Sequence, residues 1–208
     1  MDKEPRIPQT VVERLPLYLR HLLHLQKNNI NKISSQALGE HLAVNPAQIR
    51  KDLAFFGEFG RKGIGYEVDY LIERIMHILN LNQRLNVALV GAGRLGVALC
   101  HYNQSRETNL FISHVFDSDE TKTGMQIGTI QVSSMDGMEK AITEHDIRIA
   151  IITVPYFAAQ SVAEKLVFAG ISAILNFAPI SLRLPSHVHV KSADFTTELQ
   201  SLAYYVFE

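Results

Sequence analysis

The chain has 208 residues, of which 47% are hydrophobic and 20% are charged, a balance that suits one large or two small globular domains and excludes a disordered chain. The net charge of −1 divides into +3 over residues 1–85 and −4 over residues 86–208, which indicates two parts with different partners. No apolar run approaches the roughly 20 residues of a membrane span, and the N-terminus lacks a signal-peptide pattern, so we expect a cytoplasmic protein with no membrane partner.

The first part of the chain is predicted to form three helices. Apolar residues recur at helical spacing over residues 10–27. A second helix begins in SSQALGEHL, with Ser34 or Ser35 as its N-cap, and a third begins in NPAQIRKDLAFF, with Asn45 as its N-cap and Pro46 as its first helical residue. The short link between the second and third helices predicts a helix-turn-helix.

The third helix has an outer face typical of a helix that enters the major groove of DNA. At about 100° per residue, Ile49, Leu53 and Phe56 fall together and are expected to pack inward, while Lys51 points the opposite way. An ordinary solvated face, with Arg50 paired to a nearby acid, is the alternative. The outer face combines small residues, an amide and two cations: Ala47, Ala54, Gln48, Arg50 and Lys51.

The segment GEFGRKGIGYEV predicts a glycine-rich hairpin rather than a flexible linker. Phe59, Ile64 and Tyr66 can anchor this hairpin. Arg61 and Lys62 lie at its tip, where two cations fit phosphates or a minor groove, as in the wing of a winged helix.

The second part of the chain alternates between strands and helices. It follows an amphipathic helix over residues 67–81 and a domain boundary in NQRLN, and it includes a loop and short hairpin over residues 118–134. The apolar strands NVALV, LFISHVFD, IRIAIIT and SAILNF indicate a parallel sheet covered on both faces. We therefore expect an α/β fold with a Rossmann-like doubly wound sheet. Helices are predicted over residues 94–105, about 135–144 and 156–169, and in the C-terminal DFTTELQSLAYYVF.

The stretch GAGRLG has the spacing of a phosphate-binding turn. It follows an apolar strand and opens a helix whose N-terminus offers N–H groups to phosphates. Asp117 ends the next strand, about 20 residues further on, where an acid binds the adenosine ribose. A 2′-phosphate would meet a like charge there, so NADH and NAD+ are favoured over their phosphorylated forms. The candidate residues are Gly91, Ala92, Gly93, Arg94, Leu95, Gly96 and Asp117.

Two more predicted strands end in proline-containing turns, TVP and LNFAP. Ligands bind beyond the carboxyl ends of the strands in open α/β sheets, so both turns are expected at the same site. Pro155, Phe177 and Pro179 can wall an apolar nicotinamide pocket, although turns without any ligand contact are the alternative. The candidate residues are Thr153, Val154, Pro155, Asn176, Phe177, Ala178 and Pro179.

Beyond this cofactor site, the sequence shows no residues arranged for hydride transfer. Only about 30 residues follow the last predicted strand, too few for a substrate domain. His187 and His189 alternate in PSHVHV without a Cys or acid placed nearby, so an edge strand is expected rather than a metal site. Cys100, the single cysteine, is expected to be buried. We expect no metal and no catalytic residue, but an NAD-dependent oxidoreductase and a nucleotide- or CoA-binding regulator without DNA affinity stay open.

Taken in order, QIRKDLAFFGEFGRKGIGY, VGAGRLG, TVP and LNFAP resemble the Rex family of bacterial redox-sensing transcriptional repressors, over nearly the whole chain. The resemblance implies a homodimer that is not an enzyme and that binds double-stranded operator DNA according to the NADH/NAD+ ratio. NADH is expected to reorient the dimer and release the operator. The resemblance also implies a winged-helix domain over residues 1–82, a Rossmann domain over 83–192 and a swapped dimerisation helix over 193–208.

The resemblance assigns DNA-binding and switch residues as well. Family members carry an Arg in the first helix, a Tyr after the glycine turn and an Asp before the last helix, and Arg20, Tyr102 and Asp194 stand at those places. The implied DNA contacts on the recognition helix and wing are Ala47, Gln48, Arg50, Lys51, Arg61, Lys62, Gly63 and Tyr66.

Overall fold

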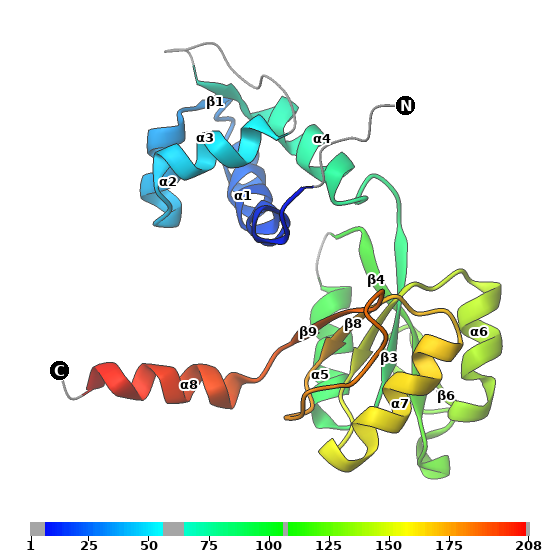
Figure 1. The fold of residues 1–208 in the computed structure, drawn as a ribbon. Coiled ribbons are helices and arrows are strands. Elements are labelled where there is room, and N and C mark those ends of the chain that lie inside the picture. The colour runs from blue at the N-terminus through cyan, green and yellow to red at the C-terminus, as the bar shows by residue number, and fades with distance from the viewer. Residues whose placement is uncertain (1–6, 56–64, 106–107, 207–208) are drawn as a thin grey trace. The chain divides into compact units, whose positions relative to one another are not determined.

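The computed structural model describes residues 7–55, 65–105 and 108–206, arranged in two compact units (Figure 1). The first unit covers residues 1–83 and the second residues 84–208, and each has its own hydrophobic core. The expected wing residues Arg61, Lys62 and Gly63 lie outside the described residues, as do Phe56, Phe59 and Ile64.

The first unit is a helix-turn-helix domain, as the sequence predicted. Ser34 caps the second helix by accepting a hydrogen bond from the Ala37 amide, and Asn45 caps the third in the same way from Ala47. Its elements are α1 (Gln9–Lys27), β1 (Lys32–Ile33), α2 (Ser35–Leu42), α3 (Pro46–Ala54), β2 (Tyr66–Glu67) and α4 (Val68–Ile78).

The turn between α2 and α3 depends on close backbone packing. Ala43 adopts a left-handed φ of 53°, and the chain then folds back over α2. A Cβ atom on Gly39 would lie 2.5 Å from the carbonyl oxygen of Val44, so only glycine fits there. The turn between α2 and α3 therefore packs directly on α2 at Gly39.

The helix α4 is shorter than the predicted residues 67–81. Asn80 adopts a left-handed φ of 55°, a conformation that asparagine tolerates and that ends a helix. The amide of Leu81 then bonds to the carbonyl of Met76, and Leu81 packs against the core of the first unit. At the other end of α4, β2 pairs antiparallel with β1.

The second unit has the predicted Rossmann sheet, with the strand order β5-β6-β4-β3-β7-β8-β9. Six strands are parallel, and only β5 runs antiparallel to its neighbour. Without β5, this order matches the dinucleotide-binding 3-2-1-4-5-6 order, in which the crevice lies between the first and fourth strands, here β3 and β7. The strands are β3 (Leu85–Val90), β4 (Leu110–Asp117), β5 (Gln126–Ile127), β6 (Ile130–Ser134), β7 (Ile149–Ile152), β8 (Ala173–Asn176) and β9 (His189–Ser192).

Helices cover both faces of this sheet. The buried side chains of Val87 and Leu89 share one core cluster with Cys100 of α5, while Ala88 and Val90 belong to the cluster formed with α6 and α7. Burial raises the pKa of the Cys100 thiol to about 11. The helical elements are α5 (Arg94–Gln104), η1 (Glu120–Lys122), η2 (Met135–Gly137), α6 (Met138–Glu144), α7 (Tyr156–Phe168), α8 (Phe195–Ala203) and η3 (Tyr204–Val206).

The C-terminal helix α8 extends away from the sheet (Figure 1) and buries none of its described residues. It leaves Phe195, Leu199 and Leu202 exposed, and Tyr205 of the following η3 (Tyr204–Val206) is exposed as well. The strand before it, β9, is the predicted edge strand; it begins at His189, and His187 precedes it.

Within the described ranges, no helix is long and apolar enough to cross a bilayer. Nor do three His, Cys, Asp or Glu side chains of these ranges gather as a metal site requires.

Candidate functional site

The three glycines of the turn between β3 and α5 have different surroundings. Gly91 has a φ of 108°, and a Cβ atom there would lie 2.8 Å from the carbonyl oxygen of Thr153. A Cβ atom on Gly96 would collide with the carbonyl oxygen of Gly91. A Cβ atom on Gly93 would meet nothing within 4 Å. Two glycines therefore serve packing, and Gly93 leaves open space at the N-terminus of α5, where no side chain caps the helix.

Asp117 connects the end of β4 to this turn. Its Oδ2 accepts hydrogen bonds from the amide of Ala92 at 2.7 Å and from Nζ of Lys122 at 2.9 Å, and its Oδ1 accepts one from the amide of Asp119 at 2.9 Å. Burial disfavours the charged carboxylate, but these bonds from Asp119, Lys122 and Ala92 outweigh it and hold the pKa of Asp117 below its usual value. The site therefore presents an ionised acid close to the glycine turn.

A cavity of about 720 Å³ lies beyond the carboxyl ends of the strands. It brings the glycine turn, the end of β4 and both proline-containing turns together at one site. Ten of the fourteen predicted cofactor residues line it: Gly91, Gly93, Leu95, Asp117, Thr153, Val154, Pro155, Phe177, Ala178 and Pro179.

The other four predicted residues, Ala92, Arg94, Gly96 and Asn176, are not among those that line the cavity. Asn176 is fully buried, and its side chain forms its hydrogen bonds within the LNFAP turn and the residue after it. It donates to the carbonyls of Ala178 and Ile180 at 3.0 and 2.9 Å and accepts from the amide of Ala178 at 3.0 Å. Asn176 thus shapes the turn that carries Phe177 and Pro179 to the cavity.

Ten residues of the cavity wall are not among the predicted cofactor residues, and three of these ten bear on the chemistry of the site. Tyr156 and Phe157, which directly follow the TVP turn, line it with 62% and 76% of their surface exposed. Lys122 lines it beside Asp117. The signal available in the sequence was the pair of adjacent aromatic residues directly after the TVP turn, and the structure shows that both are exposed beside the cavity.

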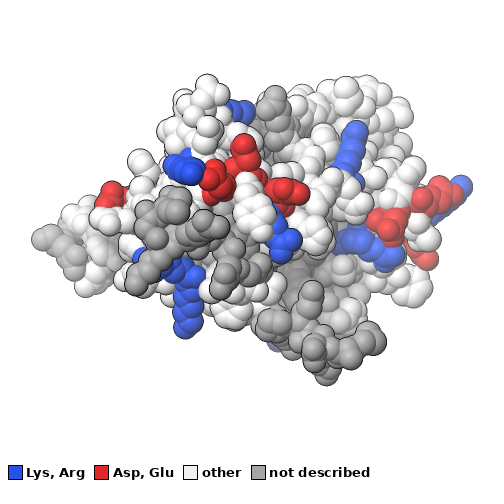
Figure 2. Space-filling view, turned by 90° about the horizontal axis from the view of Figure 1, so that it is seen from above, with Lys and Arg blue, Asp and Glu red and all other residues white. Residues whose placement is uncertain are grey.

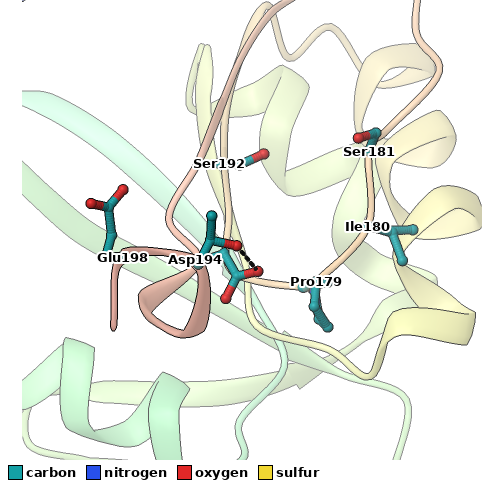
Figure 3. A pocket seen from close by; sticks show the side chains of 8 residues that line it. Pro179, Ile180, Ser181, Ser192, Asp194 and Glu198 are labelled. Atoms are coloured by element: carbon teal, nitrogen blue, oxygen red, sulfur yellow. Dashed lines mark hydrogen bonds between the residues drawn. The ribbon is translucent and has the colours of Figure 1, made fainter. Parts of the chain in front are cut away.

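A second, smaller cavity of about 310 Å³ adjoins the first and shares Ala178 and Pro179 with it (Figure 3). Asp194 and Glu198, at the start of α8, line one side. Asp194 is the N-cap of α8 and accepts hydrogen bonds from the Thr197 hydroxyl and the Thr196 amide, which lower its pKa.

The outer face of α3 is as predicted for the described residues. Ile49 and Leu53 are buried, while Ala47, Arg50 and Lys51 are exposed. Arg50 donates a hydrogen bond to the Ser35 hydroxyl at 3.0 Å, and within the described ranges it forms no ion pair with an acid. In the view of Figure 2, basic and acidic side chains are interspersed over the described surface, as expected from a small net charge.

Two expected DNA contacts have other partners within the first unit. Gln48 donates to the buried Asp52 at 2.6 Å. Tyr66 is half-buried against the core, and burial raises its pKa although nearby Arg50 lowers it. Sequence reasoning did not single out Asp52.

The three expected switch residues lie in both units. Arg20 is exposed on α1, and Tyr102 is 58% exposed on α5. With Asp194 at the start of α8, two of the three belong to the second unit.

A helix-turn-helix unit joined to a Rossmann unit with a dinucleotide-type cavity defines the class of DNA-binding regulators that respond to a small ligand. Comparisons with known proteins narrow this class. A family described as "Putative DNA-binding protein N-terminus" matches residues 6–54, and one described as "CoA binding domain" matches residues 82–180. The redox-sensing transcriptional repressor Rex of Brevibacillus brevis is 50% identical, and the match covers 99% of this chain and all of that one. The chain belongs to the Rex family, which confirms the resemblance stated above.

Other relatives also match nearly the whole chain. The Rex repressor of Chloroflexus aggregans is 43% identical over 99% of this chain and 97% of its own. Three crystal structures of RSP, a Rex-family repressor, each cover 97% of this chain. The complex with β-NAD+ and operator DNA has a TM-score of 0.90 at 35% identity and is covered over 93% of its length. The complex with β-NADH has a TM-score of 0.86 at 34% identity and is covered over 95%.

Proposed function

We propose that this chain is a transcriptional repressor whose second unit binds NADH and NAD+ and whose first unit binds double-stranded operator DNA. The observation that carries the proposal is the cavity beside Gly93 and Asp117, in the same chain as a recognition helix with an exposed Lys51. Its relatives are named as redox-sensing repressors, so we propose a regulator and not an enzyme. A repressor must reach chromosomal DNA, and we propose a cytoplasmic location for that reason.

The cavity wall favours the reduced cofactor. Pro155, Phe177 and Pro179 line the cavity, together with the exposed aromatic rings of Tyr156 and Phe157. The nicotinamide ring of NAD+ carries a positive charge and that of NADH is neutral. Burying an unpaired charge among apolar groups is costly, so NADH is the tighter ligand. The pyrophosphate sits at the N-terminus of α5 beside Gly93, and the adenosine ribose at Asp117.

The DNA contacts come from α3 and from the wing. Ala47 allows close approach to the major groove, and Gln48, Arg50 and Lys51 supply polar contacts. Arg61, Lys62, Gly63 and Tyr66 belong to the wing in this proposal.

The signal passes through a homodimer. The exposed apolar side chains of α8 need a partner, and a second copy of the chain provides one by exchange of this helix. A dimer must match half-sites about 34–36 Å apart, so a modest rotation on NADH binding removes both recognition helices from register. Arg20 and Asp194 bias this rotation by pairing in one state only, and Tyr102 belongs to the same switch.

Fluorescence anisotropy on a labelled operator duplex tests the proposal. NADH should weaken operator binding and NAD+ should not. If NADH leaves operator affinity unchanged while NAD+ weakens it, the argument from the apolar cavity is wrong.

A further inference from the structure

The only buried acid of the described part of the first unit lies on the recognition helix. Asp52 of α3 is fully buried and faces α1. Its carboxylate accepts two hydrogen bonds from Arg14, at 2.6 and 2.8 Å, and one from the Tyr18 hydroxyl at 2.7 Å. A fourth bond, at 2.6 Å, comes from Nε2 of Gln48, one turn earlier on α3. Three of these bonds cross between α1 and α3, so they fix the rotation of α3 about its own axis.

The charge of Asp52 decides which way the amide of Gln48 points. Burial disfavours the charged form, but the bonds from Arg14, Tyr18 and Gln48 outweigh it and keep the pKa of Asp52 below its usual value. An ionised carboxylate can only accept hydrogen bonds, so the Gln48 amide must turn its nitrogen toward Asp52. Its oxygen then lies on the other side of the amide.

We infer that Asp52 is a positioning residue for DNA recognition, which holds α3 on α1 and turns the Gln48 amide so that its oxygen alone reads a base edge. This inference rests on the proposed binding of operator DNA through α3. A free glutamine contacts adenine through two bonds, with its oxygen on the N6 amino group and its nitrogen on N7. Turning both atoms to the groove would remove a bond from a buried carboxylate, which is unfavourable. Gln48 therefore acts as an acceptor for an exocyclic amino group, of adenine or of cytosine, and ignores the purine N7.

The test uses duplexes selected from a random library by the full-length wild-type protein. The same selection with Gln48→Met identifies the base pair at which preference depends on Gln48. At that pair, two analogues are compared: one lacks the exocyclic amino group and one replaces the purine by its 7-deaza form. Loss of the amino group should weaken wild-type binding about tenfold and leave Gln48→Met unaffected, since one base contact is lost. The 7-deaza analogue should affect both proteins equally.

The role of Asp52 is tested by Asp52→Asn, whose amide no longer dictates the direction of Gln48. Affinity should fall about tenfold or more, and the preference at the Gln48 base pair should disappear, because α3 loses its charged anchor. Asp69→Asn is the matched control, since Asp69 accepts a hydrogen bond from Gln26 in the same unit at 2.8 Å but is exposed and lies on α4. This control should bind and select as the wild type does.

Three outcomes overturn the inference. One is unchanged selection by both Gln48→Met and Asp52→Asn. The second is a 7-deaza analogue that weakens the wild type and spares Gln48→Met, which means a two-bond contact. The third is a wild type that binds the selected duplex with the same affinity whether or not the exocyclic amino group is present. If Asp52→Asn does not fold, the analogues on wild type and Gln48→Met still decide. A wild type that binds no duplex contradicts the proposed function itself.

Discussion

The carboxylate of Asp117 accepts a hydrogen bond from the backbone amide of Ala92, 2.7 Å away, and so joins the end of β4 to the glycine turn that follows β3. One of its oxygens therefore supports the turn that would hold the pyrophosphate, while the residue lines the cavity where the ribose is proposed to bind. Cofactor binding and the shape of the turn are coupled through this single side chain.

Replacement of Asp117 by alanine should weaken NADH binding. The variant loses the proposed ribose contact and the bond to the turn, so we expect the Kd to rise about tenfold to a hundredfold. Isothermal titration calorimetry measures this, with the exposed Asp136→Ala as a control. An unchanged affinity would place the ribose elsewhere.

A second prediction separates binding from folding within the glycine turn. Gly93→Ala adds a methyl group to open space at an ordinary φ of −80°, so the free energy of unfolding should stay within about 0.5 kcal/mol of the wild type. The affinity for NADH should fall about tenfold or more, because the added methyl group lies where the pyrophosphate is proposed to bind.

Gly96→Ala is the matched comparison for that variant. It places a methyl group against the carbonyl of Gly91, so we expect a loss of about 1–3 kcal/mol in the free energy of unfolding. Urea unfolding and calorimetry on both variants check the contrast. Equal stability of the two would contradict the packing role given to Gly96.

Lys51→Ala should weaken operator binding and leave NADH affinity unchanged. If Lys51 contacts a phosphate, the slope of log K against log salt should fall by about 1 per half-site. Lys140→Ala, an exposed lysine of α6, is the control. Operator binding equal to the wild type would remove Lys51 from the proposed contacts.

The buried Asp52 should make the stability of the first unit depend on acid. Its folded pKa lies below the ordinary value of 3.8, so the stabilisation is complete above that value and is lost as the pH falls through the folded pKa. As the pH falls below about 3.8 toward the folded pKa, the difference in unfolding free energy between wild type and Asp52→Asn should therefore become smaller. Urea unfolding followed by circular dichroism at several pH values measures it, and a constant difference down to about pH 3 would refute the assignment.

Charge on the apolar surface of α8 should separate the proposed dimer. Leu199→Glu puts a carboxylate where a partner chain is expected to pack, and burial of an unpaired charge there is costly. We expect a monomer in sedimentation equilibrium and weaker operator binding, whereas Gln200→Glu, with the same added charge on an exposed polar position, stays a dimer. A dimeric Leu199→Glu would show that α8 is not the interface.

The sequence predicted the features that depend on neighbouring residues. The caps at Ser34 and Asn45, the glycine turn and the acid at the end of the next strand each follow from short-range spacing, and each is found in the structure. The features it missed depend on residues that meet only through tertiary packing. Asp52 of α3 accepts hydrogen bonds from Arg14 of α1, which lies 38 residues earlier in the chain. The role of Asn176 is local by contrast, because its amide bonds to Ala178 and Ile180, two and four residues further on.

The burial of Cys100 has a consequence for how such a regulator would respond to oxidants. The chain has no other thiol, and this one lies on the buried side of α5 with a pKa of about 11, so at neutral pH it is neither ionised nor accessible. Peroxide and disulfide exchange therefore have no thiolate on which to act. The redox state would be read through reversible occupancy of the cavity, and the response would reset as fast as the cofactor dissociates, with no enzyme needed for repair.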